Sequence, residues 1–414
     1  MFWAFMSQVL SPDHACREAL QKVLAGLMGL FGRPASPSTA AYCQARKRLS
    51  CDWLCRIHEG VQERLEKAAV GGRLWYGRIV KIVDGSSVSM PDTEENQAAF
   101  PQPDGQKAGC GFPVARLAVI FSLAAGTVLD LAWDSLHVAE TTLFRRMWDG
   151  LAAGDVLLAD RGFCSFADFW CLMQRGVDSV MRLNARRRAG VRVVRVLGKD
   201  DRIVEWIKTK VIPVWMGLAE WEAMPSVVRL REIRFGVDIP GFRTRAVTVV
   251  TTLLDARTYP AEAFADLYRR RWSAELFLRD IKITMGMDVL RCKSPDMIER
   301  ELRMFLIAYN LVRALILQAA QKYRSDPDRL SFKGTLSKVR QWAPMLASVR
   351  NRATLRRLTG ALLQQIAFDP VPDRPNRIEP RAVKRRPKQY SRLIKPRREF
   401  REIFHRNRYE AALT

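Results

Sequence analysis

Apolar residues recur at helical spacing in the first part of the chain. The stripe that opens the pattern is made of Val23, Leu24, Leu27 and Met28, and such spacing places side chains on one face of an α-helix. A Pro- and Ser-rich segment at 34–38 interrupts the pattern, and a second helical stretch carries Arg46, Lys47 and Arg48. We therefore expect a helical N-terminal region over residues 1–73. It is either a small bundle with a solvated basic face or a DNA-binding unit.

From residue 78 onward, short apolar and β-branched runs replace the helical pattern, as is typical of strands. These runs occupy 78–84, 117–121, 128–133, 156–160 and 179–183. Gly126 lies between the second and third runs, as a hairpin requires, and helical segments separate the last three runs. The order predicts three antiparallel strands followed by two parallel strands reached through helical crossovers. The expected fold class is α/β, with a mixed sheet that begins in residues 74–184.

The rest of the chain has a different pattern. Strand-like runs at 191–196, 208–215, 227–235 and 246–254 predict a β-rich insertion subdomain over 185–256. A single helix is expected from Pro260 to about Thr284, with Gly286 as its stop. Further helices follow, so that residues 257–370 complete the core. Residues 371–414 form a basic tail punctuated by prolines.

Composition and charge narrow the class of protein. The chain has 68 Lys and Arg residues against 43 Asp and Glu residues, a formal net charge of +25, and 48% of its residues are hydrophobic. This hydrophobic share excludes a wholly disordered or fibrous chain, and the charge indicates a polyanionic partner. The eight cysteines are scattered, without the spacing of zinc ligands. The longest uncharged apolar run, Leu117–Leu129, is shorter than the ~20 residues of a membrane helix, so we expect no membrane association and a cytoplasmic location.

Two aspartates end strand-like runs. Asp84 ends the run 78–84, and Asp160 ends the run 156–160. A carboxylate at the end of an apolar strand is costly unless it is solvated, paired or bound to a cation. Ligands bind at the carboxyl ends of strands in open α/β sheets. Either aspartate can instead simply cap the turn that follows it.

The helix predicted after the insertion presents a polar face. This face consists of Tyr268, Arg271, Glu275 and Lys282, which lie within a stripe of about 60° at ~100° per residue. One alternative is a solvated face with an Arg271–Glu275 ion pair. The other is a catalytic face. Clustered carboxylates provide the hard oxygen ligands that Mg²⁺ prefers. Two such ions activate the attacking oxygen and stabilise the leaving oxygen when a phosphodiester bond is cleaved or transferred. Cations beside the carboxylates hold the phosphates of the DNA.

The spacing Tyr268-x2-Arg271-x3-Glu275-x6-Lys282 resembles the Y-R-E-K signature of the insertion-sequence 4 family of bacterial DDE transposases. Asp84, followed by Gly85-Ser86, resembles the first acidic motif of that family, and Asp160, followed by Arg161-Gly162-Phe163, resembles the second. The resemblance covers about residues 75–320. It implies a ribonuclease H-like fold in which a β-rich insertion precedes the catalytic glutamate.

The same resemblance implies roles for single residues. They are the metal-binding and catalytic Asp84, Asp160 and Glu275, and the DNA-binding Tyr268, Arg271 and Lys282. Arg161, next to Asp160, either pairs with a carboxylate or reaches a DNA phosphate. The implied cofactor is a pair of Mg²⁺ ions, with Mn²⁺ as a substitute. The implied partner is double-stranded DNA, at the transposon ends and at the target, bound by a homodimer in the synaptic complex.

Two other functions fit part of the pattern. A non-catalytic DNA-binding relic or repressor would explain the charge, but it has no chemical need for three carboxylates. A hydrolytic nuclease with the same core would cleave DNA without joining it. The complete triad favours a transposase that cleaves the ends of an insertion sequence and joins them to target DNA.

Overall fold

The structure is a computed structural model that describes residues 1–32, 36–69, 73–184, 190–237, 246–372, 393–396 and 399. Most of the predicted basic tail therefore lies outside the described residues. The N-terminal part contains the helices α1 (Phe2–Leu10), α2 (Cys16–Phe31), α3 (Thr39–Lys47) and α4 (Cys51–Ala69). Arg46, expected on a basic face, is instead buried beneath the rings of Phe5 and Tyr42. Its guanidinium donates to Gln8, so it supports packing rather than a basic surface.

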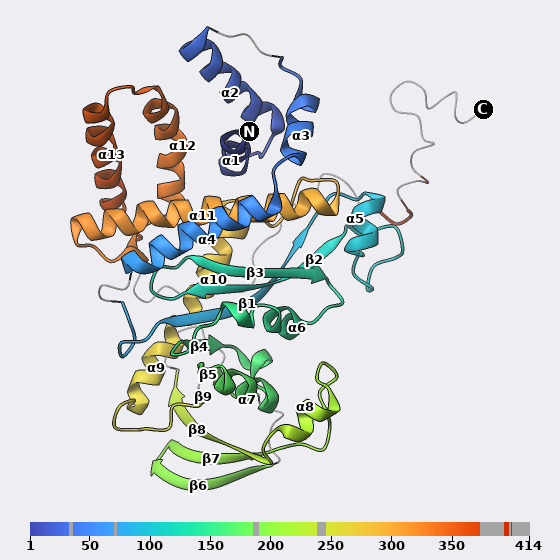
Figure 1. The fold of residues 1–414 in the computed structure, drawn as a ribbon, viewed down its shortest axis with the longest axis vertical. Helices are drawn as coiled ribbons and strands as arrows, with labels where there is room; N and C mark the ends of the chain where they lie inside the picture. The colour runs from blue at the N-terminus through green and yellow to red at the C-terminus, as the bar shows by residue number, and fades with distance from the viewer. Residues whose placement is uncertain are drawn as a thin grey trace.

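A mixed sheet forms the centre of the molecule (Figure 1), with the order β3-β2-β1-β4-β5-β9-β8-β7-β6. The strands of its first half are β1 (Val80–Ser89), β2 (Val114–Ser122), β3 (Val128–Ser135), β4 (Val156–Ala159) and β5 (Asp178–Arg182). β2 pairs antiparallel with β1 and β3, whereas β4 pairs parallel with β1 and β5. This arrangement confirms the predicted α/β fold with a ribonuclease H-like mixed sheet.

The strands of the predicted insertion continue the same sheet. They are β6 (Val191–Gly198), β7 (Asp201–Ile207), β8 (Val227–Gly236) and β9 (Ala246–Thr251), and β9 pairs antiparallel with β5. The run 208–215, predicted as a strand, forms none. Lys208 Nζ donates to the carbonyls of Trp221 and Met224 around the short helix α8 (Leu218–Ala223), and Pro213 has no N–H for a ladder.

Helices cover both faces of the sheet. One face carries α9 (Ala261–Arg270), α10 (Trp272–Arg279) and α11 (Pro295–Tyr323), whose buried residues pack with Ile82 and Leu158. The other face carries α6 (Glu140–Arg145) and α7 (Phe166–Gln174), which pack with Val83 and Leu157. Successive residues of a strand point to opposite faces, so each strand contributes to both cores.

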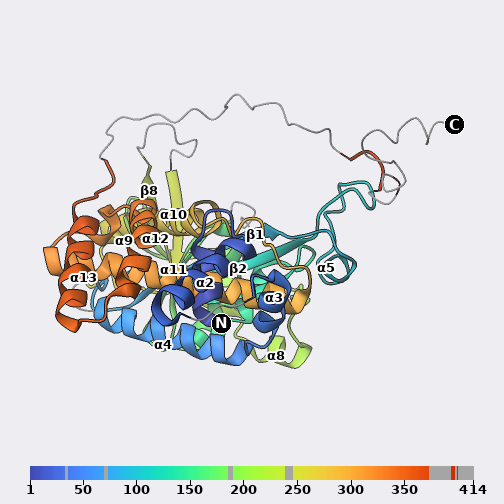
Figure 2. The same ribbon diagram turned by 90° about the horizontal axis from the view of Figure 1, so that it is seen from above.

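The remaining helices are α5 (Glu94–Ala99), α12 (Phe332–Ser348) and α13 (Arg352–Ala367). α12 and α13 form a hairpin that lies, with α1–α3, on the side of α11 away from the sheet (Figure 1). Seen from above, α13 and α12 occupy one end of this layer, and α2 and α3 lie farther along it (Figure 2).

Two predicted boundaries near the candidate site are wrong. β1 does not end at Asp84 but continues to Ser89, because Gly85, Ser86 and Ser87 all pair with β2. Their small polar side chains suggested a turn, but ladder pairing uses only the backbone. The expected single helix over 260–284 is divided into α9, α10 and a π-helical turn at Asp280–Thr284. The N–H of Met285 donates to the carbonyl of Asp280, the five-residue spacing of a π turn.

α11 holds the turn between β2 and β3 through buried polar side chains. The Tyr309 hydroxyl donates to the carbonyl of Gly126 at 2.8 Å. Asn310 accepts from the N–H of Val128 and donates to its carbonyl, both at 2.9 Å. The helix is long and apolar enough to cross a membrane, but 72% of its most apolar window is buried inside the fold. Its apolar surface is therefore accounted for by the core.

We expect Asn310→Ala to lower the free energy of unfolding by about 1–3 kcal/mol, because the buried N–H of Val128 loses its acceptor. Chemical denaturation followed by circular dichroism measures the change. Gln321→Ala is the matched control on the same helix, since its bond to the carbonyl of Ala68 is exposed. The control should cost less than about 0.5 kcal/mol. Equal losses in the two variants would contradict a structural role for Asn310.

Candidate active site

Parallel pairing of β1 with β4 brings the two predicted aspartates side by side. Ile82 lies opposite Leu158 in the ladder, and the same offset places Asp84 level with Asp160. Neighbouring strands lie about 4.8 Å apart. Because Ile82 and Leu158 face the core beneath α10 and α11, the aspartates two residues further on face the same side. The pairing register alone therefore juxtaposes the two carboxylates.

Neither aspartate is needed to cap a helix. Asp160 immediately precedes the short 3-10 turn Arg161–Phe163, but its side chain makes no capping hydrogen bond. Asp84 lies within β1, where one carboxylate oxygen accepts from the N–H of Gly85 at 2.9 Å. Asp160 therefore does not cap the turn that follows it, which was the alternative role for this residue.

α10 places Glu275 on the same side of the sheet. Ala274 and Phe277 are buried in the core shared with β1, and the ring of Phe277 lies 5.5 Å from that of Phe121 on β2. Glu275 keeps 46% of its side chain exposed, and its Oε1 is 3.3 Å from Nη2 of Arg271. The three predicted carboxylates thus come from β1, from the end of β4 and from α10.

Arg271 is a buried cation whose charge interacts with all three carboxylates. The residue is 6% exposed, and its Nε has no hydrogen-bond partner among the described residues. Burial by itself lowers the pKa of Arg271, but the neighbouring charges of Asp160, Asp84 and Glu275 help to raise it above the ordinary value. Tyr268 contributes to the same rise. All three carboxylates therefore act on the charge of Arg271, and Glu275 pairs with it directly.

The electrostatics of Asp84 are those of a crowded acidic site. Burial raises the pKa of Asp84, and the charges of Glu275 and Asp160 add to that rise. The N–H of Gly85 and the guanidinium of Arg271 act in the opposite direction without cancelling it. Ionised Asp84 is therefore held at a cost in free energy, which a bound cation would reduce.

Tyr268 lies against the second aspartate. The residue is 5% exposed, and its hydroxyl donates to Oδ1 of Asp160 at 3.4 Å. The guanidinium of Arg271 lies 5.6 Å from its ring centre. Burial raises the pKa of Tyr268, so the phenol keeps its proton and can serve as a donor. Tyr268 is thus placed to orient Asp160.

Lys282 reaches the site from the π-helical turn rather than from a continuous α-helix. Its Nζ donates to Oγ of Ser86 at 2.8 Å, and Ser86 lies two residues after Asp84 on the same side of β1. Burial lowers the pKa of Lys282. Arg161 is exposed on the turn that follows Asp160. Among the described residues, no hydrogen-bond or ion-pair partner is seen for the Arg161 side chain. The other six predicted site residues contact one another or their immediate neighbours.

Sequence reasoning missed two supporting residues. Ser86, the acceptor for Lys282, was noted only as part of a motif. Glu140 at the start of α6 places its carboxyl group directly over Gly85, so a side chain at this position would require the Glu140 side chain to move. The glycine after Asp84 was therefore a signal for a close contact from the opposite face of the sheet, although the sequence does not say from which residue.

The donor set suits a hard divalent cation, since it consists of carboxylate oxygens. In the described part of the chain, however, no three Asp, Glu, His or Cys side chains are gathered closely enough to enclose a metal ion. Glu275 is turned towards Arg271 instead. The residues fit a metal site by type, by strand register and by the raised pKa of Asp84.

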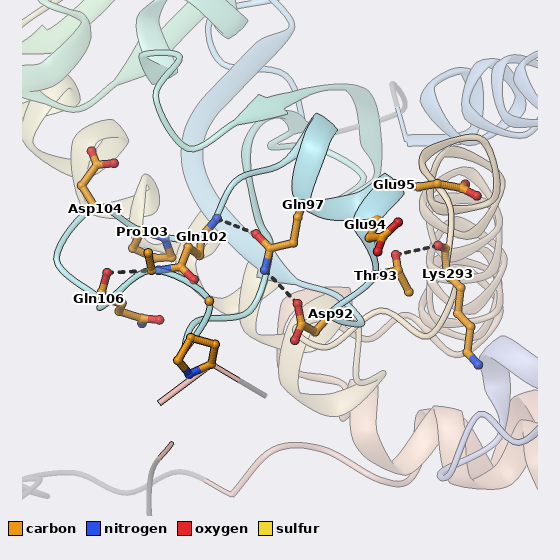
Figure 3. A pocket seen from close by; sticks show the side chains of 13 residues that line it. Asp92, Thr93, Glu94, Glu95, Gln97, Gln102, Pro103, Asp104, Gln106 and Lys293 are labelled. Carbon is orange, nitrogen blue, oxygen red and sulfur yellow. Dashed lines mark hydrogen bonds between the residues drawn. The ribbon is translucent and has the colours of Figure 1, made fainter. Parts of the chain in front are cut away.

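A separate hollow lies among the residues that follow β1 (Figure 3). It measures about 1220 Å³, and its walls include Asp92, Glu94, Glu95 and Asp104. None of the predicted site residues lines it. Its four carboxylates would repel DNA phosphates, so the hollow is a poor candidate for the DNA path.

We expect Asp84→Asn to raise the melting temperature at neutral pH. The pKa of Asp84 is raised in the folded state, so its ionisation destabilises the fold above that pKa. The penalty disappears below the ordinary aspartate pKa of about 3.9, where both states are protonated. The gain should therefore shrink as the pH falls. Thermal denaturation across a pH series measures it, and exposed Asp266→Asn is the control. A gain that is independent of pH would contradict this account.

Comparison with known proteins identifies the family of the chain. Residues 75–311 match the family model described as the transposase DDE domain. The chain is 28% identical over 398 residues to the transposase InsG for insertion sequence element IS4 of Escherichia coli strain K12, an alignment that spans 94% of this chain and 86% of InsG. A cryo-EM structure of a piggyBac transposase synaptic complex with hairpin DNA matches with a TM-score of 0.37 and 8% identity, over 69% of this chain and 57% of that one. The family match covers more than half of the chain and confirms the resemblance to the insertion-sequence 4 family: this protein belongs to the family of DDE transposases.

Proposed function

We propose that Asp84, Asp160 and Glu275 are the catalytic carboxylates of this DDE transposase and that they hold two Mg²⁺ ions. The observation that carries the proposal is the register of β1 and β4, which sets Asp84 level with Asp160 on the side of the sheet where α10 presents Glu275. Use of a divalent metal is common to the family, and the all-carboxylate donor set favours Mg²⁺. Mn²⁺, which accepts the same ligands, is the expected substitute.

The reaction is the cleavage of phosphodiester bonds at the ends of an insertion sequence and their joining to target DNA. Bound divalent ions would activate the attacking oxygen and stabilise the leaving oxygen. Asp84 and Asp160 provide ligands from a rigid sheet, and Tyr268 orients Asp160 through its hydroxyl. Glu275 would provide the third ligand if it left Arg271, and the guanidinium of Arg271 would then be available to a phosphate.

The surrounding cations would hold the DNA strand. Arg271 and Lys282 lie on the two sides of Glu275 along the chain, and Ser86 fixes the ammonium group of Lys282 beside β1. Arg161 is exposed next to Asp160 and is assigned to a phosphate in the same strand. Phosphate contacts of this kind position the substrate without reading its sequence.

The assembly that we propose is a homodimer on two transposon ends, acting in the cytoplasm. The proposed division of the chain is an N-terminal helical region over 1–73, a core over 74–184 and 257–370, an insertion over 185–256 and a tail over 371–414. Burial of Arg46 removes one cation from the presumed N-terminal DNA surface, whereas Lys47 and Arg48 remain exposed. Recognition of the transposon end is assigned to this N-terminal region.

Loss of any one carboxylate should abolish strand cleavage. We expect Asp84→Asn, Asp160→Asn and Glu275→Gln each to reduce Mg²⁺-dependent cleavage of end-sequence DNA by at least about 100-fold, since each removes a metal ligand. DNA affinity should be preserved, because no cation is lost. Glu63→Gln is the control, because Glu63 lies exposed on α4 in a pair with Lys67.

The products of the same assay separate the alternatives. Cleavage that survives these substitutions would show that the carboxylates are wrongly assigned. DNA binding without metal-dependent cleavage by the unmodified protein would indicate a relic or repressor. Cleavage without any joined product would indicate a nuclease.

Metal binding should be measurable without DNA. An excess of MgCl2 is expected to raise the melting temperature of the unmodified protein, because a ligand that binds only the folded state stabilises it, by about 2.7 kcal/mol at 100 times its Kd. Asp84→Asn should lose most of this shift, and Glu63→Gln should keep it. An equal shift in both variants would place the metal elsewhere.

A further inference from the structure

The far ends of α12 and α13 project from the body of the protein. Residues 337–361, which we call the hairpin tip, contain no buried residue. The hairpin is anchored at its base instead, where Phe332, Leu336, Leu362 and Leu363 pack in the main core. Within the tip, Trp342 and Leu346 are partly buried against the same core. Packing therefore accounts for these apolar residues but not for the cations of the tip.

That composition is strongly one-sided. No Asp or Glu occurs between Phe332 and Phe368. The cations in this stretch are Lys333, Lys338, Arg340, Arg350, Arg352, Arg356 and Arg357. Arg352, Arg356 and Arg357 are all exposed on the first turns of α13. Arg352 and Arg356 are four residues apart, a spacing at which like charges weaken a helix, so the tip bears a repulsion that a polyanion would relieve.

The position of the hairpin connects it with the candidate active site. α12 contacts the π-helical turn that carries Lys282. α12 is 17 residues long in all, about 25 Å at 1.5 Å per residue. Roughly seven base pairs of duplex at 3.4 Å each would span that length. A duplex that is held at Lys282 and follows α12 would reach the hairpin tip.

We propose that the hairpin tip binds the phosphate backbone of duplex DNA, with Arg352, Arg356 and Arg357 as its principal contacts. The inference rests on the proposed function, because it extends the DNA path from the candidate carboxylates. The partner follows from charge complementarity: an exposed surface that has cations and no carboxylates suits a regular array of phosphates. The contact adds affinity without base specificity.

The test is DNA affinity as a function of salt, measured by fluorescence anisotropy with a labelled duplex in EDTA, so that no cleavage is needed. We expect R352Q/R356Q/R357Q to weaken binding at least about 10-fold and to reduce the slope of log K against log salt by about 2–3. R352K/R356K/R357K keeps the charge and should bind nearly as the unmodified protein does. The melting temperature should not fall, because the substitutions remove repulsion between exposed side chains.

The control variant removes the same number of charges at the other end of the molecule. Arg195, Lys199 and Lys210 are exposed around β6 and β7, far from α12 and α13 (Figure 1), and R195Q/K199Q/K210Q should change the salt slope little. An equal effect of the two triple variants would overturn the inference, and so would unchanged binding by R352Q/R356Q/R357Q. Loss of dimers in sedimentation with intact DNA affinity would overturn it in favour of a subunit interface. Cleavage of DNA by Asp84→Asn tests the proposed function. The binding results do not depend on cleavage, so the two proposals can fail separately.

Discussion

Burial of the Asp84 carboxylate, with two further carboxylates nearby, is the constraint on which the arrangement of the candidate site depends. The ladder between β1 and β4 ends at Ile82 and Leu158, and its register, continued by two residues, sets Asp84 level with Asp160. Asp84 is itself held in β1 by its pairing with Val119 of β2. Burial and the neighbouring carboxylates raise the pKa of Asp84. In the free protein, buried Arg271 is the group that offsets this repulsion, and it pairs directly with Glu275. Arg271 thus stabilises the carboxylates of the free protein at the place where the proposed Mg²⁺ ions would bind.

The frame around the site keeps this strained arrangement in register. α11 holds the β2–β3 turn through Tyr309 and Asn310, which joins the helical layer to the sheet. Glu140 packs on Gly85 from the opposite face, and Lys282 holds Ser86 from the near face. β1 is therefore fixed on both sides at the residues directly after Asp84. A site built on strands in this way keeps its geometry better than one built on loops.

Much of this could be predicted from the sequence, and the failures have physical reasons. The order of apolar runs predicted parallel strands reached through crossovers. The resemblance to the ribonuclease H fold then placed the first strand beside the fourth, and with them Asp84 beside Asp160. The end of β1 was predicted wrongly because polar residues can pair through their backbone as well as apolar ones. The break at the π-helical turn carries no signal in residue type. Burial of Arg46 depends on Phe5 and Tyr42, whose partnership in space cannot be predicted from spacing alone.

The charges of the protein are distributed unevenly, so two parts of its surface differ in sign although the net charge is positive. A total of +25 suggests a polyanion-binding protein, but the hollow beside β1 is lined by carboxylates and the hairpin tip carries none. Phosphates are therefore repelled from one region and attracted to the other, which favours one path for DNA across the surface. Arg271 lies where that path would meet the carboxylates. If a phosphate takes Arg271 from Glu275, the acidic site loses its internal counter-ion and its affinity for divalent cations rises. DNA and metal would then bind cooperatively, because each relieves a charge that the other leaves unbalanced.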